Sequence, residues 1–95
     1  MSALFHITTR EAWDRACAAG EYRPASLASE GFIHLSTAAQ WPSTQQRFYR
    51  GVPDLVLLHV TPAELDIRYE RADGDDFPHL YGPLPISAVI DVTAI

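Results

Sequence analysis

Two of the four histidines in this sequence stand in matching contexts that favour chemistry at neutral pH. His6 opens the run H-I-T and His34 opens the run H-L-S, so a hydroxyl follows each ring two residues later, at Thr8 and Ser36. Side chains two apart in a strand share one face of a sheet. Neutral imidazole can both donate and accept hydrogen bonds. If the two strands flank one cleft, the pattern predicts a small polar pocket that can hold a sugar hydroxyl or move a proton.

A structural interpretation of the same residues stays open. A histidine on a half-buried strand often does no more than satisfy local polar groups. Ser36 and Thr37 precede an expected helix, and capping that helix would by itself explain their hydroxyls. His59 follows four apolar residues and is expected to satisfy a backbone group inside the sheet.

Three further candidates come from the second half of the chain. His79 and Tyr81 lie in F-P-H-L-Y-G-P-L, an expected ordered loop fixed by prolines, where they either contact a ligand or hydrogen-bond the loop itself. Glu70 lies in I-R-Y-E-R, and a carboxylate there can hold a ribose hydroxyl or stabilise the cation formed when a glycosidic bond breaks. The alternative for Glu70 is a solvated face with Arg68 and Arg71 as partners.

No metal site or resident cofactor is expected. The histidines at positions 6, 34, 59 and 79 lack a paired spacing such as H-x-x-x-H, and the single Cys17 excludes a zinc cage of cysteines. A single cysteine also excludes a disulfide within the chain, which fits a reducing compartment.

Composition restricts the class of protein. With 95 residues, 47% hydrophobic and 20% charged, the chain is expected to form one globular domain over residues 1–95. Its net charge of −5 argues against nucleic-acid binding, although a local pocket can still take a small anion. The first residues show no signal peptide, and no apolar run approaches the roughly 20 residues of a membrane helix, so a cytoplasmic protein without membrane contact is expected.

The elements that must position these side chains follow from periodicity and capping signals. Alternation and apolar runs predict strands over 3–8, 31–35, 54–60, 65–71 and 88–95, with 54–60 covered on both faces. Thr8 to Glu11 forms a capping box for a helix that ends at Gly20, and a second helix is expected over 43–49. Residues 21–29 and 77–85 are expected to be loops. The fold class is therefore α+β, with short mixed or antiparallel strands and two helices.

Long blocks of the sequence resemble the bacterial domain-of-unknown-function 952 family over nearly the whole chain. These blocks are E-G-F-I-H-L-S-T, D-L-V-L-L-H-V, R-Y-E, F-P-H-L-Y-G-P-L and A-V-I-D-V. The resemblance implies a compact version of the ADP-ribosyltransferase fold, which RNA 2′-phosphotransferases also use. The run A-L-F-H-I-T-T resembles the strand with H-G-T that opens the phosphotransferase branch, and G-F-I-H-L-S resembles its second strand.

What the resemblance implies for function is a nucleotide-type cleft. His34 and Glu70 would be catalytic, with Glu70 standing where transferases keep a glutamate. His6 and His34 would hold the ribose and phosphate side, and Ser36 would assist. Thr8, His79 and Tyr81 complete the expected ligand-binding set. NAD or a related ADP-ribose compound would then be a substrate, in a transferase or glycohydrolase reaction.

One departure keeps a second hypothesis open. Ile7 replaces the glycine of H-G-T, where close approach of a ligand to the backbone can require glycine. The short acidic chain also leaves no room for an RNA-binding part. The alternative is therefore a non-catalytic module that binds a small ligand or a protein partner of unknown identity.

Overall fold

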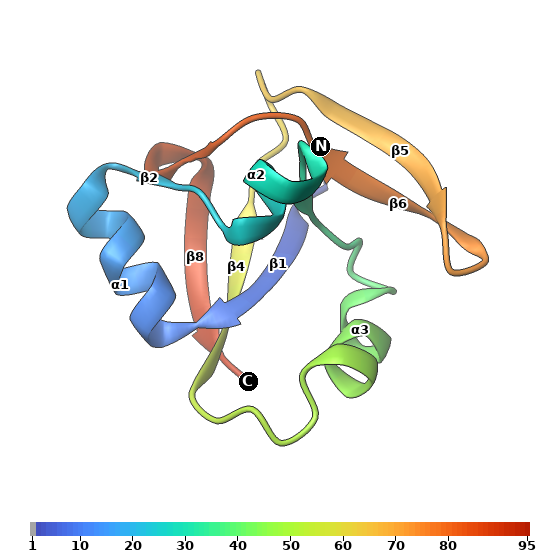
Figure 1. Ribbon diagram of the computed structural model, residues 1–95, viewed down its shortest axis with the longest axis horizontal. Helices are drawn as coiled ribbons and strands as arrows, with labels where there is room; N and C mark the ends of the chain where they lie inside the picture. Colours follow the sequence, from blue (N-terminus) through green and yellow to red (C-terminus); the bar gives the residue numbers. More distant parts are fainter. Residues whose placement is uncertain (1) are drawn as a thin grey trace.

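Two three-stranded antiparallel sheets, one two-stranded ribbon and three α-helices make up residues 2–95, which the computed structural model describes (Figure 1). The elements are β1 (Leu4–Thr9), α1 (Arg10–Ala19), β2 (Glu21–Tyr22), α2 (Ala25–Glu30), β3 (Ile33–His34), α3 (Trp41–Phe48), β4 (Leu55–Val60), β5 (Ile67–Ala72), β6 (Asp75–Leu80), β7 (Leu84–Pro85), the 3₁₀ turn η1 (Ile86–Ala88) and β8 (Val89–Ala94). The α+β class is confirmed and every pairing is antiparallel. None of the helices in residues 2–95 is long and apolar enough to span a membrane.

The first sheet has the order β1-β4-β8, with the apolar strand β4 in the middle. Leu58 on one face of β4 belongs to a core cluster that contains Trp13 of α1. Leu57 on the other face belongs to a cluster against which Trp41 of α3 packs. The prediction that this strand is covered on both faces is confirmed, since α1 and α3 lie to either side of β1 and β4 (Figure 1).

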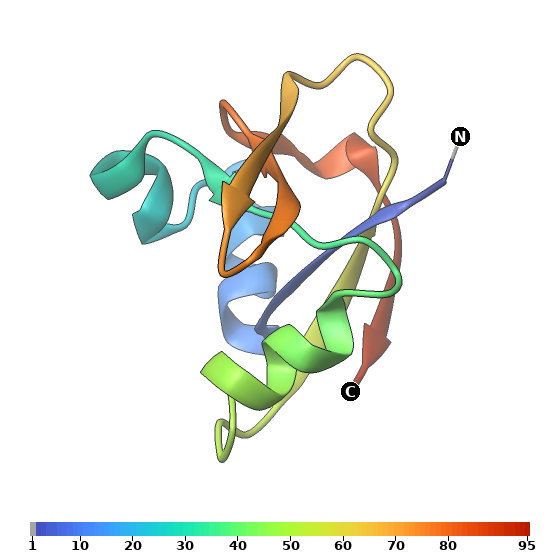
Figure 2. The same cartoon turned by 90° about the vertical axis from the view of Figure 1, so that its right-hand side faces the viewer.

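The second sheet, β3-β6-β5, meets the first through the residues that follow β3. Ser36 and Phe5 of β1 exchange two backbone hydrogen bonds of 2.8 Å each. The chain thus leaves β3 at His34 and is bound to the free edge of β1 two residues later. Figure 2 shows this segment passing from the β5–β6 hairpin toward β1 and α3. The two H-x-hydroxyl segments therefore lie next to each other.

The loop predicted over 77–85 is wrong, because most of it forms β6 and β7. Pro78 lies in β6, the middle strand of its sheet, although proline cannot donate to a ladder. In an antiparallel strand the nitrogen and carbonyl of one residue point toward the same neighbour. The Pro78 carbonyl accepts from the Leu35 amide at 3.0 Å, one residue beyond the end of β3. The missing N–H therefore falls where that pairing ends.

The loop predicted over 21–29 is also wrong, and a third helix lies there. Pro24 precedes α2, a position that tolerates the absence of an amide hydrogen, and Gly31 ends the helix in the left-handed conformation at φ 88°. Tyr22 pairs with Leu84 in the β2–β7 ribbon.

The helix α1 begins one residue later than the predicted capping box. Thr9 is the N-cap, and its hydroxyl accepts a hydrogen bond from the Ala12 amide at 3.1 Å. Thr8 is still inside β1 with its hydroxyl turned toward Tyr22, so it is not free to cap. The predicted end at Gly20 is confirmed, with φ 93°.

Candidate functional site

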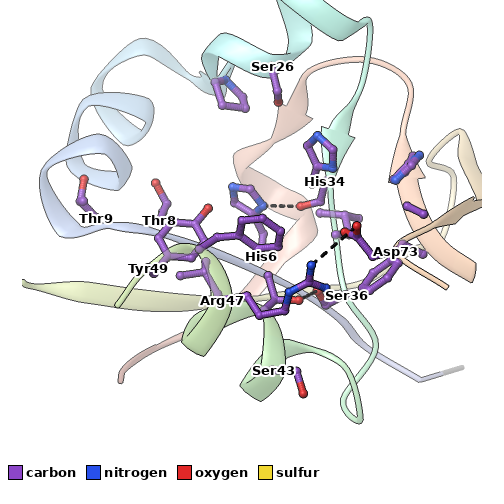
Figure 3. A pocket seen from close by; sticks show the side chains of 18 of the residues that line it. His6, Thr8, Thr9, Ser26, His34, Ser36, Ser43, Arg47, Tyr49 and Asp73 are labelled. Carbon is purple, nitrogen blue, oxygen red and sulfur yellow. Dashed lines mark hydrogen bonds and ion pairs between the residues drawn. The ribbon is translucent and has the colours of Figure 1, made fainter. Parts of the chain in front are cut away.

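A cavity of about 510 Å³ opens where the two sheets and α3 meet (Figure 3). Its walls come from β1, the segment around β3, α3 and the turn between β5 and β6. Five residues singled out in the sequence line it, namely His6, Thr8, His34, Ser36 and His79. The volume lies within the range of roughly 300–1,000 Å³ that is common for small-molecule sites. Glu70 and Tyr81 are outside the lining. Glu70 is hydrogen-bonded to the lining residue His79, and Tyr81 is hydrogen-bonded to Glu70.

His6 is buried in the wall of the cavity, with 8% of its surface exposed. Its Nδ1 lies 2.6 Å from the carbonyl oxygen of His34, and its Nε2 lies 2.8 Å from the hydroxyl of Tyr22. That hydroxyl in turn lies 3.1 Å from the hydroxyl of Thr8. Figure 3 shows the bond from His6 reaching the backbone of His34 while the His34 ring points elsewhere. The H-I-T and H-L-S segments are thus joined by a hydrogen bond from the His6 ring to the His34 backbone.

The direction of these hydrogen bonds follows from the His34 carbonyl, which can only accept. Nδ1 of His6 must therefore carry the proton of the neutral ring, and Nε2 accepts from the Tyr22 hydroxyl. Burial lowers the pKa of His6 to about 4, against an opposing effect of the His34 carbonyl, so the ring is neutral at pH 7. Burial also raises the pKa of Tyr22.

A second histidine, His79, is held by a carboxylate of the second sheet. Its Nδ1 donates to Oε1 of Glu70 at 2.8 Å, and the Tyr81 hydroxyl donates to the same oxygen at 2.5 Å. These two hydrogen bonds, that from Tyr81 first, lower the pKa of Glu70, and the bond to the carboxylate raises the pKa of Tyr81. Within residues 2–95, the buried Nε2 of His79 has no hydrogen-bond partner.

Aromatic rings hold His79 and its neighbours in place. Phe32 stacks on His79 with ring centroids 4.1 Å apart and an angle of 14° between the planes. His34 meets His79 edge to face at 5.3 Å, and its Nε2 lies 3.0 Å from a carboxylate oxygen of Glu30. The Arg68 guanidinium lies 4.2 Å from the centre of the Tyr81 ring.

The remaining predicted residue, Ser36, contacts Thr44 of α3, with 3.5 Å between the hydroxyl oxygens. The capping role expected for Ser36 and Thr37 is not seen, because Gln40 is the N-cap of α3. His59 bonds the Thr93 hydroxyl of β8 at 3.0 Å instead of a backbone group. Among residues 2–95 no group of histidine, cysteine, aspartate and glutamate side chains has the geometry of a metal site.

Two important residues of the cavity were not found from the sequence. Tyr22 was assigned to a loop, and only its pairing in the β2–β7 ribbon brings it to His6. Arg47 of α3 lines the cavity and faces Asp73 of the β5–β6 turn, with 3.7 Å between charged atoms (Figure 3). A lone arginine after the expected helix start carries no local signal that it lines a pocket.

Fold and cavity together define a small α+β protein with a histidine-lined cavity at the junction of two antiparallel sheets. Residues 7–92 match the family model described as "Protein of unknown function (DUF952)", and the chain belongs to this family. The family resemblance seen in the sequence is thereby confirmed. A comparison with curated proteins gave no match.

The chain is also similar to solved structures of protein CC0527 from Caulobacter crescentus. The crystal structure is 37% identical, covers 98% of this chain and 85% of that one, and superimposes with a TM-score of 0.90. The solution NMR structure is 38% identical over 98% and 84%, with a TM-score of 0.83. The resemblance to the ADP-ribosyltransferase fold stays a prediction.

Proposed function

We propose that the cavity binds a small nucleotide-type ligand of the NAD and ADP-ribose class. The observation that carries this proposal is the convergence of His6, His34 and His79 with the Thr8 and Ser36 hydroxyls around one cavity of about 510 Å³. Imidazole and hydroxyl groups suit ribose hydroxyls, and they are set in apolar walls as ligand sites usually are. Both nitrogens of His6 are already bonded within the protein, so His6 shapes the wall, and the other groups are the ones free to bind.

Arg47 supplies the positive charge that the phosphates of such a ligand need. It is the only lysine or arginine in the cavity lining of the described residues. A guanidinium can bind phosphate oxygens through two parallel hydrogen bonds. Its contact with Asp73 is long, at 3.7 Å, and both side chains are about half exposed, so little stability is lost when a phosphate replaces the carboxylate. Phe48, Tyr49 and Phe77 offer rings against which a base can stack.

Cleavage of a glycosidic bond is the catalytic form of the proposal. In it, the bond between ribose and nicotinamide breaks, nicotinamide leaves as a neutral molecule, and Glu70 stabilises the sugar cation. Water, or an acceptor hydroxyl in a transferase, then bonds to the sugar carbon and gives its proton to His34. Binding without chemistry is the second candidate, and the position of Glu70 favours it. The Glu70 carboxylate accepts hydrogen bonds from His79 and Tyr81 and does not line the cavity.

Thermal denaturation with NAD, ADP-ribose and nicotinamide tests the binding. A ligand at 100 times its Kd should stabilise the fold by about 2.7 kcal/mol. Arg47→Gln should weaken binding about tenfold through loss of a charged hydrogen bond. Arg50→Gln is the matched control, because it removes the same charge three residues away and outside the lining. No stabilisation at millimolar ligand, or equal effects of both variants, would contradict the proposal.

Release of nicotinamide from NAD distinguishes the two forms. The catalytic form predicts release by the wild-type protein and a loss of most of that activity in Glu70→Gln and in His34→Gln. Binding of NAD without any release over hours assigns the cavity to binding alone. An unchanged rate in Glu70→Gln would remove this carboxylate from the mechanism.

A further inference from the structure

One buried nitrogen in the cavity wall has no use within the described chain. Only 6% of the His79 side chain is exposed, and within residues 2–95 its Nε2 has no hydrogen-bond partner. Leaving a buried polar atom unpaired costs about 1–3 kcal/mol, so such an atom in a folded protein calls for an explanation. A ligand that enters the cavity can supply the missing partner.

In the neutral ring, the partner that this nitrogen needs is a hydrogen-bond donor. The Glu70 carboxylate can only accept from His79, so in the neutral form of the ring the proton is on Nδ1 and Nε2 presents a lone pair. Stacking on Phe32 fixes the plane of the ring, and the Tyr81 hydroxyl fixes the Glu70 oxygen that orients it. His79 lines the cavity and Glu70 does not, so Nε2 is the ring nitrogen left for a contact with a ligand there, since Nδ1 is bound to Glu70.

We propose that Nε2 of His79 accepts a hydrogen bond from a ribose hydroxyl of the bound ligand. This inference rests on the proposed function, and it adds the orientation of the ligand to it. A phosphate oxygen at neutral pH is an acceptor and would set one lone pair against another, so the anionic part of the ligand lies at Arg47 and the sugar at His79. Glu70 and Tyr81 are positioning residues, which act through the imidazole.

Isothermal titration with ADP-ribose and with its analogues that each lack one ribose hydroxyl tests the contact. One analogue should bind the wild-type protein about tenfold more weakly, because His79 Nε2 is then buried without a partner. In His79→Phe, which keeps a flat ring against Phe32, the same analogue and ADP-ribose should bind equally. This comparison is a double-mutant cycle between one hydroxyl and one side chain.

Several results would overturn the inference. They are equal binding of all analogues by the wild-type protein, or a penalty that persists unchanged in His79→Phe. A penalty only for an analogue that lacks the adenine amino group would also overturn it, since the base would then be the donor. If the wild-type protein binds no ADP-ribose at all, the proposed function falls as well, and this outcome is distinct from binding without discrimination.

The tautomer of His79 provides a readout that needs no ligand. Long-range ¹H–¹⁵N NMR correlations of the imidazole should show the proton on Nδ1, and a proton on Nε2 would overturn the inference. Glu70→Ala should abolish this preference and reduce discrimination between ADP-ribose and the sensitive analogue. This variant tests the inference even if His79→Phe fails to fold. Asp14→Ala, which removes an exposed carboxylate from α1, is the matched control and should change neither.

Discussion

His6 and His79 line the same cavity, and both rings are buried, but their hydrogen bonding differs at one atom. In each ring Nδ1 donates to an oxygen, the His34 carbonyl or the Glu70 carboxylate. Nε2 of His6 is bound to Tyr22, whereas Nε2 of His79 has no partner in residues 2–95. A ring with both nitrogens satisfied contributes to the stability of the fold, and a ring with one free nitrogen is available to a ligand.

The surroundings of the two rings differ as well. The partners of His6 are uncharged groups of the protein interior. Burial disfavours the charged form of its ring and so lowers its pKa. The partner of His79 is a carboxylate whose side chain is 41% exposed, at the rim of the second sheet. We infer that the His6 side of the cavity is rigid and structural, and that the His79 side is the one that selects a ligand.

Replacing His6 by alanine should give the largest effect on stability. His6→Ala leaves the His34 carbonyl and the Tyr22 hydroxyl without partners and opens a cavity, so the free energy of unfolding should fall by about 4 kcal/mol. Urea denaturation followed by circular dichroism measures it. His59→Ala, which breaks one contact to Thr93 at the other side of the sheet, should cost less. A loss below about 1 kcal/mol in His6→Ala would show that this ring is not structural.

Stability should also depend on pH through the same ring. The pKa of His6 is about 4 in the folded protein and ordinarily 6.5, so between these values the unfolded chain binds a proton that the folded chain does not. Lowering the pH from 6.5 to 4 should therefore reduce the free energy of unfolding by up to about 3 kcal/mol.

The upper part of this range isolates His6 from the acidic groups. The pKa of Glu70 lies below its ordinary value of 4.5, so its own loss of stabilisation comes at lower pH. Urea midpoints measured between pH 6.5 and 5 should fall in the wild-type protein and in His59→Gln. They should stay flat in His6→Gln, and an equal fall in that variant would assign the effect to another group.

The sequence predicted the strands, helix ends and site residues that depend on local patterns. Alternation and apolar runs located β1, β4 and β8, and glycine located the end of α1. The repeated order of histidine, apolar residue and hydroxyl singled out His6 and His34, because strand periodicity fixes which side chains share a face. The fold class and the family followed from the same segments.

The rest depended on pairings between distant segments. Tyr22 reaches His6 only because β2 pairs with β7 near the other end of the chain, and no local signal encodes that pairing. The presence of Pro78 predicted a loop, but β6 tolerates this proline because its missing N–H falls where the pairing with β3 ends. Glu70 and His79 were predicted as separate site residues, and their hydrogen bond follows from the β5–β6 register.

The smallest effect on stability is expected at the ring that we assign to the ligand. His79→Phe removes one hydrogen bond to a partly exposed carboxylate, but it also removes a buried nitrogen without a partner and keeps the stacking on Phe32. These contributions oppose each other, so the free energy of unfolding should change by less than about 1 kcal/mol. Urea denaturation beside His6→Phe, in which the same substitution leaves two buried oxygens unpaired, provides the matched comparison. Equal losses in the two variants would show that His79 is as structural as His6, and the division of the cavity into two sides would then be wrong.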